Sequence, residues 1–325
     1  MLRKRIIAAT GIDRQNQNIS ASELANVAEY LTENPQSVRM SVNHDITVLP
    51  MGKVIGAKLI ETPDETVLEA LIDEFVYEFD KVMGPDGTVI FCGQSKIDCR
   101  PFVQYGESSS NNLSFSLNPI HFSEEEFMAV MDEFQEYGIE IKTTIQKAWS
   151  PGIEVLIITV KGVLIYLITK KTLDKLADEV SSDIVKCYSL IKKGIMSLFR
   201  KFSKHKEKTL ILSEPDQPIE LIVRSKDAET VMIAFEKLSE SSILELVQKY
   251  ESFLNDEIDK IQFIYTDKNK NWKLNYLTTK SGKSIGTYEC YKQAVHMYEK
   301  TMASPTAGFS FNGSVEIETE KMPND

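Results

Sequence analysis

One histidine is the residue best suited to chemistry in the first half of the chain. His44 is followed directly by Asp45 and stands between an alternating polar and apolar run and the start of another predicted strand. A histidine at the end of a strand can act as the base of a hydrolytic site. Asn43 and Asp45 are also turn-forming residues, so an exposed histidine in an ordinary turn is the alternative.

Two serines lie on a later predicted strand, in the sequence LSFSLNP. Because side chains alternate along a strand, Ser114 and Ser116 share one face and Phe115 lies on the other. A nucleophilic serine needs a base within hydrogen-bond reach, and that base needs an orienting group. His121 and Glu124 are nearby in sequence, but the spacing does not identify a third catalytic member. The alternative is that both serines are polar residues on the solvent face of a strand.

The other familiar reactive motifs are missing from the sequence. The cysteines form no CxxC pair and no cluster with histidine, which argues against a zinc site and against a disulfide framework. The stretch KSGKSIGT contains Gly-Lys-Ser but lacks the upstream glycine of a phosphate-binding loop, and the HExxH, GxSxG and DxDxDG patterns do not occur. We therefore expect no metal and no cofactor.

Composition and charge are those of a soluble globular protein with room for about two domains. Of the 325 residues, 42% are hydrophobic and 26% are charged. Residues 1–150 hold 12 Lys/Arg and 23 Asp/Glu, so they carry the whole net charge of −11. This acidic half should repel nucleic acid and anionic lipid. The basic start has no apolar run of signal-peptide length, so we expect a cytoplasmic protein.

Two helices of the first half are predicted from capping boxes, in which a serine and a glutamate three residues later satisfy each other's backbone N–H groups. Ser20 and Glu23 begin the first of these helices, and Ser123 and Glu126 begin the second. Strands are predicted from alternation at 4–10, 37–42, 52–61, 88–93, 99–105, 113–119 and 139–146. The run 66–83 fits an amphipathic helix or a strand, and we favour the helix.

A domain boundary is predicted at Trp149-Ser150-Pro151-Gly152, where the pattern breaks. The apolar run 153–169 is close to the length of a membrane span, but Glu154 and Lys161 disfavour insertion. A buried helix, or a hairpin turning at Lys161 and Gly162, is the preferred interpretation.

The next segment, 186–208, is predicted to be a basic amphipathic helix. Its apolar stripe is Ile191, Ile195, Leu198 and Phe202, and its cations include Lys192, Lys193, Arg200 and Lys201. We expect the stripe to pack inside the molecule, next to the acidic first domain. The alternative is contact with an anionic membrane or an acidic partner through these cations.

The remaining sequence predicts a small α+β module. Two strands are expected within 209–225, helices at 227–238 and 242–258, a hairpin at 261–279, a third strand at 283–287 and a closing helix at 288–302. Beyond these elements the chain is rich in Ser, Gly, Asn and Glu and has no helical stripe. We expect a disordered tail at 303–325.

The first part of the chain also resembles the tailed-phage prohead (capsid maturation) serine proteases. The resemblance covers roughly residues 4–120 and is most specific from Asn43 to Val54, where a strand ends in His-Asp and Gly-Lys-Val opens the next strand. It implies a small β-barrel with packed helices. Matched to the family's pattern, His44 would be the catalytic base and Ser114 the nucleophile, with Ser116 as the alternative on the same face. The family's glycine two residues after the serine is missing here.

These observations together predict an α+β protein in four parts. The parts are a prohead-protease-like β-barrel domain at 1–150, an apolar and basic amphipathic helical segment at 151–208, a small α/β module at 209–302 and a disordered tail at 303–325. Because the serine context departs from the family pattern, we favour a non-catalytic binding or assembly protein with a protein or peptide partner. The resemblance suggests a phage or phage-defence setting. The alternatives are a serine peptidase using His44 with Ser114 or Ser116, and a peripheral membrane protein bound through 186–208.

Overall fold

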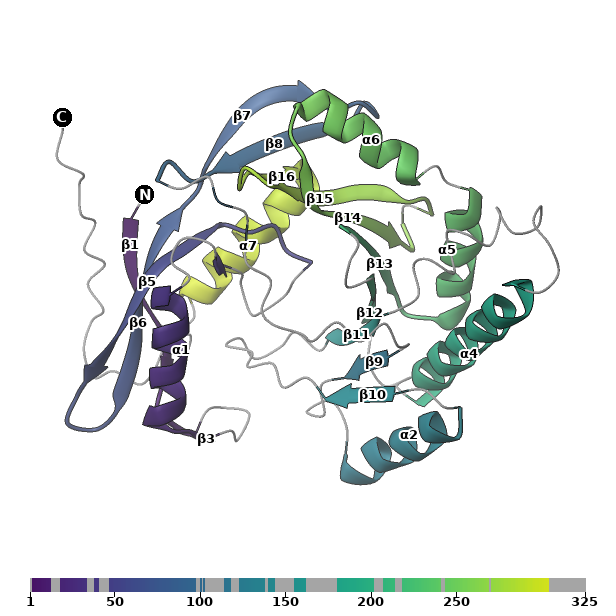
Figure 1. Cartoon of the computed structure of the whole chain (residues 1–325), viewed down its shortest axis with the longest axis horizontal. Coiled ribbons are helices and arrows are strands. Elements are labelled where there is room, and N and C mark those ends of the chain that lie inside the picture. Colours follow the sequence, from purple (N-terminus) through teal and green to yellow (C-terminus); the bar gives the residue numbers. More distant parts are fainter. Residues whose placement is uncertain are drawn as a thin grey trace.

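The fold contains two main β-sheets and six helices among the residues that the computed structural model describes (Figure 1). Those residues are 2–12, 18–33, 38–40, 47–97, 100, 102, 114–117, 123–137, 140–143, 155–161, 180–201, 207–213, 218–240, 243–268 and 270–303. The mixed α+β class predicted from the sequence is confirmed. Neither main sheet closes into a barrel within these residues, so the predicted barrel is not confirmed.

The smaller sheet has four strands and is covered on one face by a helix. Its order is β1 (Leu2–Ala9), β6 (Thr66–Glu74), β5 (Gly52–Glu61) and β4 (Val38–Met40), and all neighbouring strands are antiparallel. Helix α1 (Ala21–Glu33) buries Leu24 and Leu31 against Leu68 and Ile72 of β6. The predicted capping box is present, because the Ser20 hydroxyl accepts from the Glu23 backbone N–H and the Glu23 carboxylate accepts from the Ser20 N–H. A short pair of strands, β2 (Gly11–Ile12) and β3 (Asn18–Ile19), precedes α1.

The helix favoured for the run 66–83 is wrong, because this run forms two strands, β6 and β7 (Val76–Met83). Strand β6 lies between β1 and β5 and buries residues on both of its faces, among them Val67, Leu68 and Ile72. Apolar residues on both faces of a strand produce spacings of three and four that imitate a helical stripe. Residues 66–74 form a strand because β6 pairs with a neighbouring strand on each of its two edges.

The larger sheet has ten strands and joins the two halves of the sequence. Its order is β10 (Glu140–Thr143), β9 (Ser114–Leu117), β11 (Val155–Lys161), β12 (Glu207–Ser213), β13 (Ile219–Ser225), β14 (Ile258–Thr266), β15 (Lys273–Thr279), β16 (Ser284–Thr287), β8 (Val89–Gln94) and β7. Strand β8 pairs with β16, and β9 pairs with β11. The pairing therefore crosses the boundary that the sequence pattern placed near residue 150.

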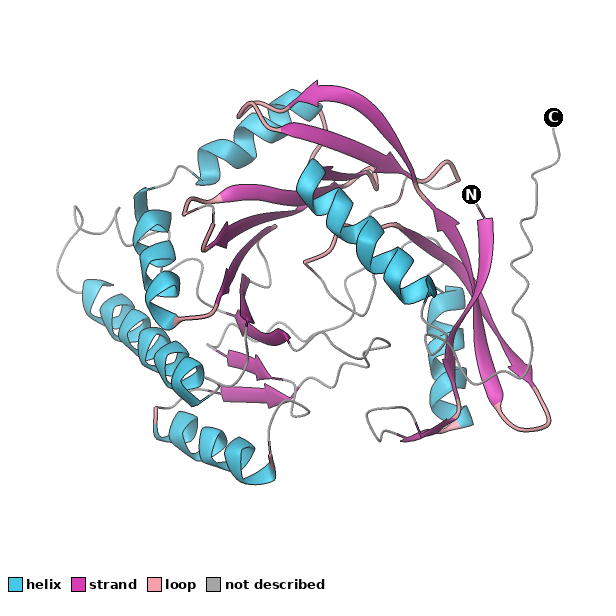
Figure 2. Ribbon diagram, turned by 180° about the vertical axis from the view of Figure 1, so that it is seen from behind, coloured by secondary structure: helices cyan, strands magenta, loops and turns pink. Residues whose placement is uncertain are grey.

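Four helices follow the outer side of the larger sheet: α2 (Glu124–Glu136), α4 (Val180–Lys201), α5 (Ala228–Glu240) and α6 (Ile243–Leu254) (Figure 1). The main core lies beneath them. Helix α7 (Tyr288–Ala303) packs on the opposite face and, as Figure 2 shows, crosses from the larger sheet toward the smaller one. The strands and helices from β12 to α7 were all predicted from the sequence. The Asp227 carboxylate, at the first residue of the helix predicted at 227–238, accepts from the Thr230 N–H at 2.7 Å and caps α5. The predicted disordered tail lies outside the described residues after Ala303.

Of the two interpretations of the run 153–169, the buried helix is wrong for its start, because residues 155–161 form strand β11 in the interior of the larger sheet. Ile158 and Val160 are fully buried there. The strand ends at Lys161, where the alternative hairpin would turn, and residues 162–179 lie outside the described part. No helix in the described ranges is both long enough and apolar enough to cross a membrane.

The predicted amphipathic helix is present as α4, and its internal packing is confirmed. Its predicted end at residue 208 is wrong, because α4 ends at Lys201 and residues 207–208 belong to strand β12. Ile191, Ile195 and Leu198 are fully buried in the main core, whereas the predicted stripe residue Phe202 lies outside the described residues. The Lys201 ammonium lies 2.7 Å from the Glu133 carboxylate of α2, so a cation of α4 does meet the acidic first half.

This ion pair predicts a small pH dependence of stability. The hydrogen bond from Lys201 holds the pKa of Glu133 below its usual value. The pair therefore stabilises the fold at neutral pH, and this contribution is lost as the pH falls below the ordinary glutamate range. We expect Glu133→Gln to lower the free energy of unfolding by about 0.5 kcal/mol at pH 7, because both partners are partly exposed. In urea titrations the difference from the wild type should vanish near pH 3; a difference that stays constant with pH would contradict this.

Candidate functional site

A single row of residues crosses the larger sheet on the face opposite the outer helices. Directly paired residues of neighbouring strands share a face, and the register links one residue from each of nine strands. We call this set the transverse row: Glu140, Ser114, Lys161, Ser213, Glu220, Gln262, Tyr276, Gly286 and Phe91. Seven of its nine residues are polar, so it is a natural place to look for chemistry.

At the centre of the transverse row, Glu220 is held by two neighbours on β14. The Lys260 ammonium lies 2.7 Å from one carboxylate oxygen, and the Gln262 amide donates to the other at 2.6 Å. The Glu220 side chain is 8% exposed and that of Lys260 is 13% exposed. A buried carboxylate with both oxygens engaged is electrostatically satisfied. This arrangement stabilises strand pairing and leaves Glu220 poorly placed to accept a proton from a substrate.

The same network continues to the segment that follows the predicted catalytic histidine. The Asn275 amide donates to Gln262 at 3.1 Å and to the backbone oxygen of Thr47 at 2.8 Å. Arg224 of β13 donates to the Thr47 hydroxyl and, at 3.1 Å, to the side-chain oxygen of Gln293 on α7. Buried hydrogen bonds therefore fasten Thr47 to the larger sheet. His44 itself lies outside the described residues.

Ser114, the predicted nucleophile, is on the transverse row. The residue is 2% exposed and lies on β9, between β10 and β11. Its register partners are Glu140 and Lys161. The hydrogen-bonded residues Glu220, Lys260, Gln262 and Asn275 form what we call the central network. Glu220 lies three strands from Ser114, or about 14 Å at the usual strand spacing, so this network does not reach the serine.

The other predicted site residues have mixed outcomes. Ser116 is a residue of β9, as predicted, but the structure describes its backbone only. His121 lies outside the described residues, and Glu124 is exposed in the first turn of α2. The pairing of His44 with Ser114 or Ser116 therefore stays a prediction. In the described part of the chain, no group of three or more His, Cys, Asp or Glu side chains is arranged to hold a metal ion.

A second polar cluster lies where the two sheets meet. Lys53 of β5 is fully buried, is paired in register with Asp73 of β6, and donates to the backbone oxygen of Arg100. Its ammonium lies 5.1 Å from the centre of the Phe102 ring. The Ser95 hydroxyl, just after β8, donates to the Asp73 carboxylate at 2.8 Å. The cluster links the smaller sheet to the larger one.

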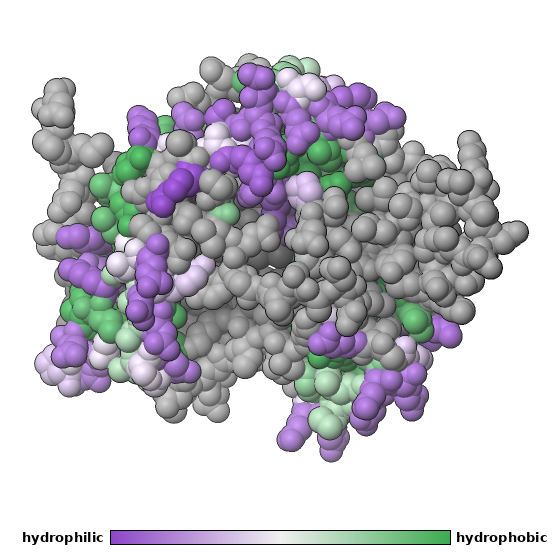
Figure 3. Space-filling model, in the orientation of Figure 1, coloured by the Kyte–Doolittle hydropathy of each residue, from purple (hydrophilic) through white to green (hydrophobic). Residues whose placement is uncertain are grey.

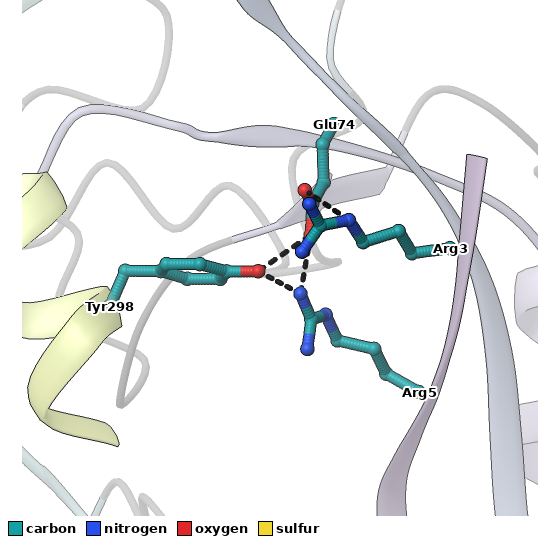
Figure 4. Close-up of polar contacts among 4 residues, drawn as sticks. All are labelled: Arg3, Arg5, Glu74 and Tyr298. Carbon is teal, nitrogen blue, oxygen red and sulfur yellow. Dashed lines mark hydrogen bonds and ion pairs between the residues drawn. The ribbon is translucent and has the colours of Figure 1, made fainter. Parts of the chain in front are cut away.

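A third cluster joins α7 to the smaller sheet, and Figure 4 shows its four side chains converging. Glu74 of β6 lies 3.0 Å from Arg3 and 2.6 Å from Arg5 of β1. The Tyr298 hydroxyl of α7 donates to Glu74 at 2.6 Å and accepts from Arg5. Burial lowers the pKa of Arg5, and the neighbouring Glu74 carboxylate opposes this shift. Two guanidinium groups already share this carboxylate, so the cluster acts as a structural tie.

Sequence reasoning missed the central network, although a signal for it was present. Glu220, Gln262 and Asn275 are polar residues inside otherwise apolar strands, in the sequences PIELIV, IQFIY and KLNYL. Buried polar residues in such strands are normally hydrogen-bonded to one another. Their partners could not be identified, because the register between strands distant in sequence was unknown.

Comparison of the chain with protein families, with curated proteins and with solved structures finds no match.

Proposed function

We propose that this chain is a non-catalytic protein-binding or assembly protein whose first part is related to the prohead proteases. The observation that carries the proposal is the burial of Ser114. At 2% exposure, and with a paired strand on each side, its hydroxyl has little room for a peptide carbonyl. A nucleophile must place its oxygen about 3 Å from the carbonyl carbon, which requires an open approach.

The state of the other polar groups supports the same proposal. The central network and the Glu74 cluster consist of side chains bonded to one another across strands or between elements. In the Lys53 cluster, Ser95 bonds to Asp73 and Lys53 bonds to the backbone oxygen of Arg100. Such satisfied networks contribute specificity to a fold. A scaffold of this kind fits a role in presenting surfaces to other proteins. The membrane alternative receives less support, because the apolar stripe of α4 is already buried.

A fluorophosphonate probe, which labels activated serines, tests the proposal. We expect the purified full-length chain to remain unlabelled at neutral pH, and Ser114→Ala, Ser116→Ala and His44→Ala to have no effect on this outcome. A known serine hydrolase in the same tube serves as the positive control. Labelling of the wild type that is lost in His44→Ala and in one of the serine variants would overturn the proposal and establish the peptidase alternative.

A further inference from the structure

Helices α2 and α4 lie side by side on the outer side of the larger sheet (Figure 1). Phe134 of α2 faces Gly194 of α4, and further along the two helices the backbone oxygen of Ala129 accepts from Lys201 at 3.1 Å. The two helices therefore run antiparallel. Helix α2 contains no Lys or Arg, whereas residues 184–201 of α4 contain no Asp or Glu. Neighbouring helices thus carry opposite charges.

The outward side of α2 is acidic. Glu125, Asp132 and Glu136 are exposed, and their spacing of seven and four residues places them on one face of the helix. Met128 adjoins this face and is 54% exposed. In Figure 3, green and purple side chains lie next to one another at the bottom of the molecule, where α2 lies in Figure 1. The face therefore combines negative charge with some apolar surface.

The outward side of α4 is basic. Lys193 and Arg200 are exposed and lie seven residues apart, so they share one face of the helix. In the described part of the chain, neither these two cations nor the three acidic residues on the outward face of α2 form an ion pair. The pair of Lys201 and Glu133 lies instead in the seam between the helices. Unpaired charges of opposite sign on neighbouring helices make a surface that is complementary to itself.

We propose that the outward faces of α2 and α4 bind the same two faces of a second copy of this chain, forming a symmetric dimer. The proposal rests on the proposed assembly function and names the partner. A two-fold axis along the seam places α2 of each copy against α4 of the other, at the same level along the helices. Because Phe134 is level with Gly194, Asp132 and Glu136 then meet the segment 193–200 of the other copy, and the symmetry makes each contact twice.

The size of this surface indicates a weak dimer. Helix α2 has 13 residues and is therefore about 20 Å long. Packed helices lie about 8–10 Å apart, so α2 and α4 together present a face about 20 Å wide. A face of these dimensions is at the low end of the sizes of specific complexes. Exposed ion pairs are also screened by salt, so the association should depend strongly on ionic strength.

Analytical ultracentrifugation of the full chain tests the proposal. We expect the wild type to dimerise in about 0.05 M salt, with a dissociation constant that rises about ten-fold or more in about 0.5 M salt. The α2 variant Asp132→Lys/Glu136→Lys and the α4 variant Lys193→Glu/Arg200→Glu should each be monomeric, because like charges then face one another. An equimolar mixture of the two variants should form a heterodimer, since each contact between α2 and α4 again joins opposite charges.

The matched control Glu61→Lys/Asp64→Lys makes the same charge change as the α2 variant, at exposed positions of the β5–β6 turn, and should dimerise like the wild type. Loss of the dimer in this control would show that net charge governs association and would overturn the proposal.

A wild type that is monomeric at low salt, or a dimer that salt does not weaken, would also overturn the proposal whether or not the variants fold. So would a dimer that persists in either charge-reversal variant, or a mixture of the two that does not associate, while circular dichroism shows folded protein. None of these results would affect the proposed lack of catalysis, because the fluorophosphonate experiment tests it separately.

Discussion

Replacing Glu220 by alanine is expected to lower the free energy of unfolding by about 3–5 kcal/mol. The substitution leaves the Lys260 ammonium, 13% exposed, without its carboxylate, and removes one acceptor of the buried Gln262 amide. Removing one partner of a buried pair costs more than the pair contributes, because the remaining charge stays desolvated. Urea denaturation followed by circular dichroism measures the change. Glu257→Ala, at an exposed turn residue, is the control and should change stability by about 0.5 kcal/mol or less.

A second pair of variants separates the charge from the hydrogen bond. Glu220→Gln alone keeps an oxygen that can accept from Gln262 but leaves Lys260 unneutralised, so we expect a loss of about 2–3 kcal/mol. The double variant Glu220→Gln/Lys260→Met also removes the ammonium that has lost its carboxylate. Its free energy of unfolding should return to within about 1 kcal/mol of the wild type. If the loss of unfolding free energy in the double variant equals the sum of the losses in Glu220→Gln and Lys260→Met, the two residues are not coupled. Our account of the network would then be wrong.

Phe134→Ala is expected to lower the free energy of unfolding by about 3–5 kcal/mol. Phe134 of α2 is fully buried, and its ring meets that of Phe115 on β9 edge to face with ring centres 4.9 Å apart. Gly194 of α4 allows this contact, since a Cβ there would lie 3.1 Å from the Phe134 ring. The ring thus packs between a strand and two helices, and its removal leaves a cavity at their junction.

Denaturation measurements on a variant of the same helix provide the comparison for Phe134. Met128 lies on α2 but is 54% exposed, so Met128→Ala should cost about 0.5 kcal/mol or less. Similar losses for the two variants would show that α2 is not packed against the sheet as described. Gly194→Ala should also destabilise, because one of the facing rings must move to admit the methyl group.

Local signals predicted the helices and hairpins of this chain well, because their causes lie within a few residues. Ser123 with Glu126 forms the expected capping box on α2, and Asp227 caps α5. The run 66–83 was misread because both faces of β6 are covered, which hides the alternation of a half-exposed strand. What decides that case is pairing with β1 and β5, and a local pattern carries no information about it.

The site was predictable only in part, for the same reason. Ser114 was correctly placed on a strand, but its burial depends on the strands that flank it, and β11 comes from beyond the predicted domain boundary. The central network depends on the register between β13, β14 and β15, and on Thr47, which lies more than 200 residues before Asn275. Sequence patterns identify such residues as unusual without revealing their neighbours.

The pairing of β8 with β16 has a consequence for the newly made chain. Strand β16 follows β8 by about 190 residues, so at synthesis rates of about 5–20 residues per second the ribosome needs about 10–40 s to deliver it. During that interval β8 can pair with β7 but has no partner on its other edge, and its apolar residues Ile90 and Phe91 lack the strands and α7 that bury them. The nascent chain is therefore exposed to aggregation through this edge from the synthesis of β8 onward, and the arrival of β16 and α7 ends that period.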